Sequence, residues 1–410
     1  MNEHIFTSDF FAGNRDRLRQ LFTGTAPIVI TANGLLQRGG DDTYPFFQDA
    51  NFWYLTGLNE PDLVLVLDKD KEYIIAPGRN AMRQTFDGAL DVDAIIQRSG
   101  VRTVTDEKDG WRQLSARLKR VQHVATLAAP PAYLDGYDMY TNPARARLVA
   151  ALKEVNASLE PLDLREHLAR MRTVKQEPEL AALQAAIDIT MATLKDVTRV
   201  QQLAKYGYEY EIEAAITAGF RKRGAVGHAF SPIVASGKRA CTLHNITNNG
   251  QLAADELVVL DVGAEVEHYS ADVTRTAALG KPSPRQRKVH EAVLDVQNYA
   301  MNLLKPGVTL REYEKQVEHY MGEKLRELGL IKTIKTEAVR QYFPHATSHF
   351  LGLNTHDAGD YERPLEPGAV LTVEPGIYIA EEAIGVRIED DVLITADGIT
   401  NLSARLPREL

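Results

Sequence analysis

The chain alternates between short apolar runs and stretches with a helical repeat. In its first part, residues 28–31, 63–67 and 73–76 form apolar runs bounded by Gly, Pro or Asp, a pattern typical of strands. Residues 111–120 and 144–155 instead carry apolar side chains at helical spacing. This mixture predicts an N-terminal α/β domain.

From residue 179 onward the rhythm changes. Apolar residues recur there at steps of three and four, as expected for one face of a long helix. They are Leu180, Leu183, Ile187, Met191, Leu194 and Val197. A second helical run covers about residues 210–222, and extended segments are predicted at 231–236, 256–262 and 271–278.

The same order of elements then repeats. Ser283 followed by Pro284 and Gln286 has the pattern of a capped helix start, and residues 309–312 form a capping box that opens another helix. Strands are predicted at 370–379 and 385–394. Two rounds of two helices followed by strands predict a duplicated α+β unit with a site between its halves, and a coincidental order without duplication is the alternative.

A polar stretch at residues 165–178 separates the two regions. We therefore predict two domains, residues 1–165 and residues 170–410. With 410 residues, of which 44% are apolar and 25% charged, the chain has the composition of an ordinary globular protein with a large core.

Charge and targeting signals narrow the classes of partner. The net charge of −9 argues against nucleic acid or an anionic membrane as the main partner. The first residues lack the basic start and apolar stretch of a signal peptide, and no apolar run approaches the roughly 18 residues that span a bilayer. The single cysteine, Cys241, suits a reducing compartment, so a cytoplasmic protein is expected. Cys241 is interpreted as a small buried residue, with a nucleophile beside His244 as the alternative.

Two aspartates stand where a strand pair should be apolar. Asp261 ends the run LVVLDV, and Asp272 follows 11 residues later in YSADVTRTA. Burying two carboxylates is costly unless they are paired, protonated or bound to a cation. With Gly263 and Tyr269 between them, the two aspartates indicate a hairpin that presents both as ligands.

The second round supplies further polar groups of the same kind. Three histidines fall within 12 residues, and two glutamates follow in VEPGIYI and RIEDD. These residues are His345, His349, His356, Glu374 and Glu389.

The segment 385–394 has an alternating pattern of its own. On one continuous strand, Arg387, Glu389 and Asp391 would share a face and the apolar residues at 386 and 388 the opposite face. That charged face would meet solvent or a site, and solvent is the commoner answer.

Carboxylates with an imidazole suit divalent manganese, cobalt or zinc, and the lack of thiolates argues against a structural zinc site. Four carboxylates would balance two such ions, since −4 + 4 = 0. Two ions about 3.5–4 Å apart can share a nucleophilic hydroxide and polarise a carbonyl. The chain has no P-loop, HExxH, GxSxG or CxxC motif that would favour another chemistry.

In their sequence motifs, five residues resemble the ligand set of the pita-bread metallopeptidases: Asp261, Asp272, His349, Glu374 and Glu389. This family includes methionine aminopeptidase, prolidase and aminopeptidase P. Residues 41–67 are similar to the N-terminal domain of the aminopeptidase P branch, and residues 172–186 to the start of its catalytic domain. The resemblance implies an α+β fold: a C-terminal pita-bread domain, which is a duplicated α+β unit, after a smaller N-terminal α/β domain.

The resemblance also implies a role for each ligand. Asp272 and Glu389 would bridge two divalent metal ions, Asp261 would complete one ion, and His349 and Glu374 the other. Manganese (Mn2+) is the expected metal, with Co2+ or Zn2+ as alternatives.

Further residues match catalytic or substrate-contacting positions of the family. Glu374 would shuttle a proton, and His244, His356 and Arg387 would assist catalysis. His244, His345 and His356 would contact substrate. Tyr378 matches a tyrosine near the ligands, or packs within its strand.

The activity implied is release of the N-terminal residue from peptides with proline in second position, by attack of a metal-bridging hydroxide. One alternative is a prolidase, which cleaves only Xaa-Pro dipeptides. A second is a methionine aminopeptidase, which does not need the first 160 residues. The others lack a metal: a pita-bread binding protein or a creatinase-like hydrolase. The N-terminal domain would restrict access to the site and pack between subunits of a homodimer or homotetramer. The aromatic run at 52–54 would line that access route or, preferably, pack in the core.

Overall fold

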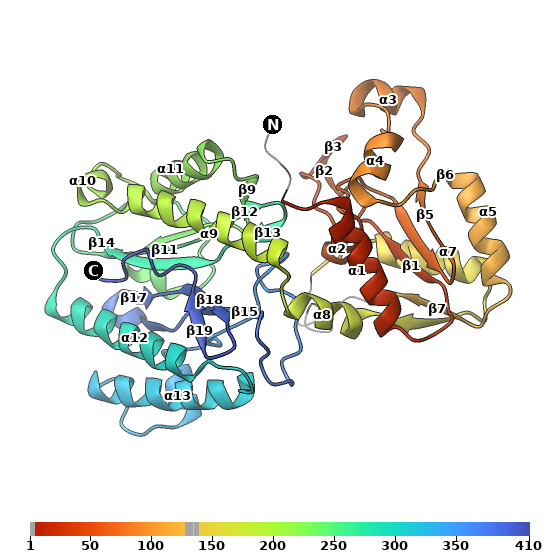
Figure 1. Ribbon diagram of the computed structural model, residues 1–410. Helices are drawn as coiled ribbons and strands as arrows, with labels where there is room; N and C mark the ends of the chain where they lie inside the picture. The colour runs from red at the N-terminus through yellow and green to blue at the C-terminus, as the bar shows by residue number, and fades with distance from the viewer. Residues whose placement is uncertain (1–4, 128–133, 135–138) are drawn as a thin grey trace. The chain divides into compact units, whose positions relative to one another are not determined.

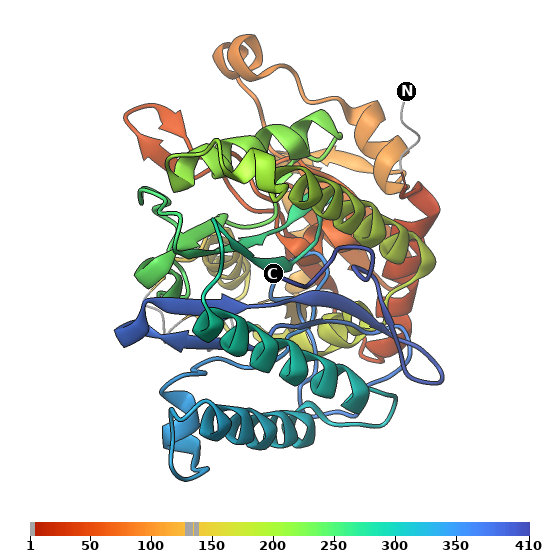
Figure 2. The same cartoon turned by 90° about the vertical axis from the view of Figure 1, so that its left-hand side faces the viewer.

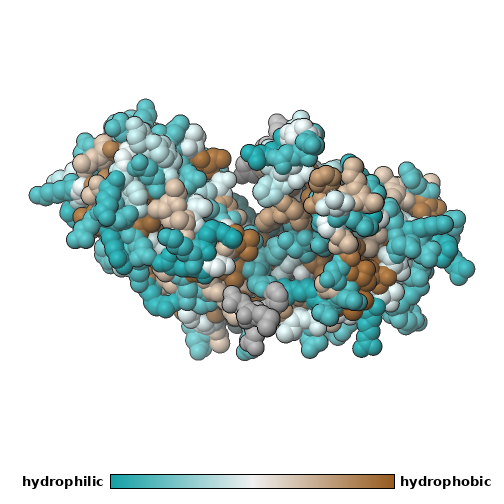
Figure 3. All heavy atoms as spheres, turned by 90° about the horizontal axis from the view of Figure 1, so that it is seen from above, coloured by the Kyte–Doolittle hydropathy of each residue, from teal (hydrophilic) through white to brown (hydrophobic). Residues whose placement is uncertain are grey.

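The computed structural model describes residues 5–127, 134 and 139–410, and the chain divides into two compact units, Met1–Met171 and Arg172–Leu410 (Figure 1). Among the described residues, no helix combines the length and apolar character required to cross a bilayer. On the face drawn in Figure 3, the surface of each unit is mainly hydrophilic, with small separate apolar areas.

The first unit is built on a mixed six-stranded sheet with the order β6-β5-β4-β1-β7-β8. Strand β4 runs antiparallel to both of its neighbours, and the other three pairings are parallel. The strands of this sheet are β1 (Ile28–Thr31), β4 (Val64–Asp68), β5 (Lys71–Ala76), β6 (Val104–Asp106), β7 (His123–Thr126) and β8 (Glu160–Asp163). The α/β domain expected from the sequence is therefore confirmed.

The described part of this unit also contains helices and a small hairpin. The helices are α1 (Ser8–Leu21), α2 (Ala50–Thr56), α3 (Ala81–Asp87), α4 (Val92–Ser99), α5 (Glu107–Leu118), α7 (Ala144–Val155) and α8 (Arg165–Thr173), the last of which continues two residues into the second unit. The hairpin pairs β2 (Gln37–Gly39) with β3 (Asp42–Thr43).

The aromatic run forms helix α2 and lies in the core of the first unit. Phe52, Trp53 and Tyr54 are each at most 1% exposed. The indole of Trp53 meets the rings of Phe6 and Phe11 edge-on, with centroids 5.2 and 5.3 Å away. Core packing is therefore confirmed for this run.

The second unit contains two similar halves. Each half has two long helices and a three-stranded antiparallel sheet, with the order β10-β11-β14 in the first half and β15-β18-β19 in the second. Figures 1 and 2 show the strands in the middle, with helices α9 and α11 on one outer face and α12 and α13 on the other. Each half has its own apolar core. The predicted duplicated α+β unit is confirmed.

The elements of the first half are α9 (Glu177–Val197), α10 (Val200–Leu203), α11 (Glu209–Lys222), β9 (Gly227–His228), β10 (Ile233–Ser236), the 3-10 helix η1 (Gly237–Cys241), β11 (Leu257–Val262), β12 (Ala264–Val266), β13 (Tyr269–Ser270) and β14 (Val273–Ala278). Those of the second half are α12 (Pro284–Leu303), α13 (Leu310–Glu327), α14 (Thr336–Arg340), β15 (Val370–Val373), β16 (Gly376–Ile379), η2 (Ala380–Glu382), β17 (Ile384–Arg387), β18 (Asp390–Ile394) and β19 (Ile399–Asn401).

The two predicted helix starts differ in detail. At α12, Ser283 and Gln286 form the full reciprocal capping box. At α13, the Thr309 side chain accepts a hydrogen bond from the Glu312 backbone N–H. The Glu312 carboxylate, however, accepts from the Thr309 hydroxyl at 3.0 Å. The residues that start each helix are thus as predicted, and the second box is incomplete.

The predicted hairpin of the first half is confirmed. Strands β11 and β14 pair antiparallel, with Asp261 opposite Thr274 and Val262 opposite Val273. Asp272 directly precedes β14, so the two aspartates come to the same end of the strand pair. The short pair β12–β13 extends the hairpin beyond them.

Two predictions about the last strands are wrong. The segments 370–379 and 385–394 are not continuous strands, because each breaks at a glutamate: Glu374 and Glu389. Pro375 cannot donate to a ladder, and the Glu374 N–H instead donates to Thr347 O at 2.9 Å. The Glu389 N–H donates to Thr274 O at 3.1 Å.

The solvent-facing interpretation of the charged face at 385–394 is also wrong. Arg387, Glu389 and Asp391 are 4%, 2% and 0% exposed. The strand is interrupted at Glu389, and all three polar side chains lie in the interior of the unit, where they require partners.

Candidate metal centre

Acidic and histidine side chains gather where the two halves of the second unit meet. A carboxylate oxygen of Asp272, another of Glu389 and a ring nitrogen of His349 all lie within 4.8 Å of one another. The Nε2 atom of His349 also lies 3.3 Å from Glu374 Oε1 and 3.6 Å from Asp272 Oδ2. The sequence predicted that these four residues would share a site, and the structure brings them together.

Hydrogen bonds donated by main-chain N–H groups cross the junction and hold the acids in place. The Glu389 N–H donates to Thr274 O, and the Asp272 N–H donates to Asp391 Oδ2 at 3.2 Å. The first bond links β14 to the strand break at Glu389, and the second links the residue before β14 to a side chain of β18. The breaks that interrupt the predicted strands are therefore the points at which carboxylates enter the cluster.

The orientation of His349 leaves one ring nitrogen facing the acids. Its Nδ1 lies 3.0 Å from Phe350 O, which requires a proton on Nδ1. Burial lowers the pKa of His349, but hydrogen bonds to Asp272 and Glu374 outweigh it and raise the pKa well above the usual range. The surroundings of Nε2 therefore favour a positive charge at this atom.

The carboxylates themselves carry strongly shifted pKa values. Burial, followed by the charges of Asp272 and Glu374, raises the pKa of Glu389 well above its usual range. Burial is also the main cause that raises the pKa of Asp272 to about 7. For Glu374 burial acts in the same direction, but the hydrogen bond and charge of His349 outweigh it and lower the pKa to about 2. Such a group of acids is stabilised by cations.

Arg387 supplies one positive charge to the cluster. Its Nη2 donates to Asp261 Oδ2 at 2.5 Å, its Nη1 to Tyr378 OH at 2.8 Å and its Nε to Thr274 Oγ1 at 3.3 Å. The other oxygen of Asp261, Oδ1, is buried and has no hydrogen-bond partner among the described residues. One Asp261 oxygen is thus held by the arginine, and the other remains available to a ligand.

Tyr378 belongs to the same network. Its hydroxyl accepts from Arg387 and lies 2.8 Å from His345 Nε2, and the side chain is 6% exposed. Tyr378 therefore links Arg387 to a histidine of the site, in agreement with a position near the ligands.

The structure also brings the other predicted histidines to the cluster. His345 Nδ1 lies 3.8 Å from Glu374 Oε2, and the His356 ring lies 4.3 Å from the His349 ring between centroids. His244 is exposed on the loop after η1. Burial is the main cause of the lowered pKa of His356, and the charges of His349 and His244 add to it. His244 is therefore near His356.

Several polar residues of the site were not identified from the sequence. Thr274 donates to Glu389 Oε2 at 2.6 Å, and Thr372 donates to Glu374 Oε1 at 3.4 Å. Glu314, on α13, accepts from the N–H groups of Thr347 and Ser348, which precede His349. Strand alternation could have identified Thr274, because it lies two residues after Asp272. No local signal marks Glu314.

The nucleophile interpretation of Cys241 is not supported. Its Sγ donates to Ile384 O at 3.4 Å, and burial is the main cause that raises its pKa to about 11. The thiol therefore stays protonated near neutral pH, where it is a poor nucleophile.

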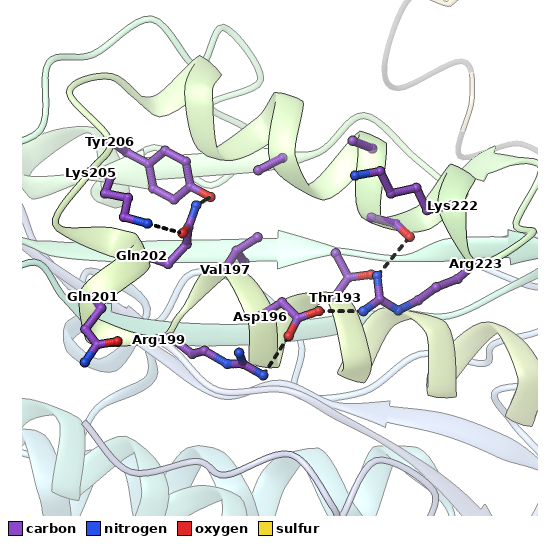
Figure 4. Close-up of a pocket in the computed structure, with 13 residues that line it drawn as sticks. Thr193, Asp196, Val197, Arg199, Gln201, Gln202, Lys205, Tyr206, Lys222 and Arg223 are labelled. Atoms are coloured by element: carbon purple, nitrogen blue, oxygen red, sulfur yellow. Dashed lines mark hydrogen bonds and ion pairs between the residues drawn. The ribbon is translucent and has the colours of Figure 1, made fainter.

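A cavity of about 640 Å³ lies between α9, α10 and α11, away from these acids (Figure 4). Charged side chains line it, and Arg199 and Arg223 both pair with Asp196, at 2.9 and 2.5 Å. It contains none of the residues of the cluster. Ion pairs of this exposed kind are ordinary surface features, so the candidate centre is the acid cluster.

Carboxylates and an imidazole at the junction of two similar α+β halves are the groups expected of a metallopeptidase. Residues 181–396 match the family model of metallopeptidase family M24, and residues 11–125 match that of the aminopeptidase P N-terminal domain. The chain therefore belongs to metallopeptidase family M24, in the branch that carries the aminopeptidase P N-terminal domain.

Similar proteins match over nearly the whole chain. A Haemophilus influenzae Xaa-Pro aminopeptidase is 36% identical over 91% of this chain and 89% of its own length. An Escherichia coli Xaa-Pro aminopeptidase is 34% identical over 99% and 96%, respectively. Among solved structures, zinc-substituted E. coli aminopeptidase P in complex with product has a TM-score of 0.86 and 30% identity, and the match covers 98% of this chain and 96% of that chain.

Proposed function

We propose that the protein is an Xaa-Pro aminopeptidase, which removes the N-terminal residue from peptides with proline in second position. The single observation that carries this proposal is the cluster of Asp272, His349 and Glu389 in a chain that matches Xaa-Pro aminopeptidases along both of its units. An Xaa-Pro bond lacks an N–H and populates both isomers. A dedicated site is therefore useful for it.

The residues of the cluster fit two divalent cations. Asp261, Asp272, His349, Glu374 and Glu389 would hold these ions. Two observations support this assignment: Asp261 Oδ1 has no hydrogen-bond partner in the described part of the chain, and His349 Nε2 faces Asp272 and Glu374. Manganese is our first choice, with cobalt or zinc as alternatives. Cations bound there would polarise the scissile carbonyl and lower the pKa of water.

The remaining roles follow from charge and position. Glu374 is proposed to accept a proton at a carboxylate oxygen and to pass it to the leaving nitrogen. His244 and His356 are proposed to donate hydrogen bonds to the oxyanion, and His345 to contact substrate. Arg387 holds Asp261 in its ligand orientation.

The first unit is proposed to restrict access to the site and to join subunits in a homodimer or homotetramer. Four large apolar side chains around its β2–β3 hairpin support an interface, because each is more than 40% exposed: Leu35, Leu36, Tyr44 and Phe47. Light scattering after size exclusion should give a mass of two or four chains. A cytoplasmic location is also proposed and is tested by cell fractionation.

Peptide hydrolysis tests the activity directly. Protein reconstituted with manganese should release the free N-terminal residue from Xaa-Pro-Yaa tripeptides, and a chelator should abolish this release. Asp261→Asn should lose most of the activity, because it weakens one ligand. No release from any such tripeptide by the wild-type protein would refute the proposal.

Comparing a dipeptide with longer substrates distinguishes an Xaa-Pro aminopeptidase from a prolidase, the main alternative. A prolidase cleaves only Xaa-Pro dipeptides, and the match of the first unit to the aminopeptidase P N-terminal domain does not favour it. We expect tripeptides and longer peptides to be cleaved with the higher kcat/KM. Metal analysis distinguishes a metal-free binding protein, which would retain no divalent ion after reconstitution.

A further inference from the structure

A buried ion triad lies beside the cluster and has no part in the roles assigned above. It consists of Asp357, Arg172 and Lys175. Asp357 Oδ1 pairs with Arg172 Nη2, and Asp357 Oδ2 lies 3.1 Å from Lys175 Nζ. All three side chains are at most 2% exposed. Buried charges require close partners, so the three groups depend on one another.

Asp357 closes the loop that carries two histidines of the site. Its backbone N–H donates to Phe350 O at 2.8 Å, and this bond joins the two ends of the loop. His349 directly precedes one end and His356 directly precedes the other. The centroids of these two histidine rings lie 4.3 Å apart.

Further contacts fix the loop against the triad. Asp357 Oδ1 accepts from the Asn354 N–H at 3.3 Å. A Cβ atom at Gly352 would lie 2.2 Å from Asp357 Oδ2 and 2.9 Å from Lys175 Nζ, so the loop can approach this closely only with glycine there. The Asp357–Lys175 pair therefore lies directly against the backbone at Gly352.

The two cations come from the first residues of the second unit and are themselves anchored. Lys175 Nζ donates to Arg172 O at 2.6 Å, and the Lys175 N–H donates to Gly368 O at 2.9 Å. Val174 forms an antiparallel bridge with Ala369, which directly precedes β15. The segment 172–175 therefore forms part of the framework beneath the site, although the family match begins at residue 181.

We propose that Asp357, held between Arg172 and Lys175, is a positioning residue that sets the place of His356 relative to His349 during peptide hydrolysis. This inference rests on the proposed function. Asp357 does not touch the reacting atoms and acts through the loop. The segment 172–175 is then required for full activity and is more than a connection between units.

A double-mutant cycle between Asp357 and His356 tests the proposal. Asp357→Asn in the manganese-loaded full-length protein should lower kcat/KM about 10- to 100-fold, the usual size of an effect transmitted through ligand partners. If Asp357 acts through His356, the double variant with His356→Ala should be no worse than His356→Ala alone. If the double variant instead loses kcat/KM by the product of the two single-variant factors, the proposal is overturned.

Controls separate positioning from general loss of structure. Arg15→Met removes a buried arginine paired with Glu72 at 2.8 Å in the first unit, and its effect should multiply with that of His356→Ala. If Asp357→Asn does not fold, Lys175→Met replaces it in the cycle. A double variant no worse than His356→Ala again supports the proposal, and effects on kcat/KM that multiply again overturn it. Bound manganese should be unchanged in each variant, and loss of metal from Lys175→Met would also overturn the proposal. An inactive wild-type protein would instead refute the proposed function.

Discussion

The buried carboxylate of Glu265 should contribute to a loss of stability as pH rises. Glu265 lies on β12, is 6% exposed, and burial raises its pKa from 4.5 to about 7. The nearest cationic candidate, His268 Nδ1, is 4.0 Å away and is charged only when protonated. We predict that Glu265→Gln stabilises the protein at neutral and higher pH.

The sign and size of this change in the free energy of unfolding follow from proton linkage. Below pH 4.5 both the folded and the unfolded chain hold this proton, so it does not affect stability. Between pH 4.5 and about 7 the unfolded chain releases the proton and the folded chain keeps it, so stability falls as pH rises. The difference of 7 − 4.5 = 2.5 units corresponds to about 3 kcal/mol, fully lost above pH 7.

Urea unfolding followed by circular dichroism measures this effect. Tryptophan fluorescence would not serve, because both tryptophans, Trp53 and Trp111, belong to the first unit. The free energy of unfolding of Glu265→Gln should exceed that of the wild type by up to about 3 kcal/mol near pH 8, and the gain should shrink towards about pH 5. The exposed Glu366→Gln is the control. Equal stability of Glu265→Gln and wild type near pH 8 would refute the reasoning.

Three other substitutions probe the site and the core. Thr274→Val removes the hydroxyl that donates to Glu389 and should lower manganese affinity or kcat about 10- to 100-fold, as measured by metal titration and tripeptide hydrolysis. Tyr378→Phe removes the contact of Arg387 with the phenol and should lower kcat while bound manganese stays constant; an unchanged kcat would contradict a role for this hydroxyl. Leu371→Ala empties a fully buried position in the second half and should cost about 2–5 kcal/mol in urea unfolding, and a cost below 1 kcal/mol would contradict the packing described here.

Local sequence signals predicted the elements of this fold where short-range physics decides them. The apolar period gave the bounds of α7, and the Ser283 side chain caps α12 as expected. The breaks at Glu374 and Glu389 could not be predicted from the alternation around them. They depend on hydrogen bonds to Thr347 and Thr274, which the fold brings from distant parts of the chain.

The same distinction applies to the site. Asp261 and Asp272 were identifiable because carboxylates are costly in an apolar strand pair. Arg172 and Lys175, by contrast, occur in a polar stretch that is typical of a connecting segment. Their partner, Asp357, lies 185 residues beyond Arg172, and only the folded chain shows that the three charges are buried together.

The raised pKa of the one cysteine has a practical consequence for experiments. With a pKa of about 11, roughly one Cys241 thiol in 10,000 is ionised at neutral pH, so thiol-directed probes should label the wild-type protein very slowly. A cysteine introduced at an exposed position would then carry a dye or spin label with little background. One such label in each unit would allow distances between the units to be measured in solution, without first removing a native thiol.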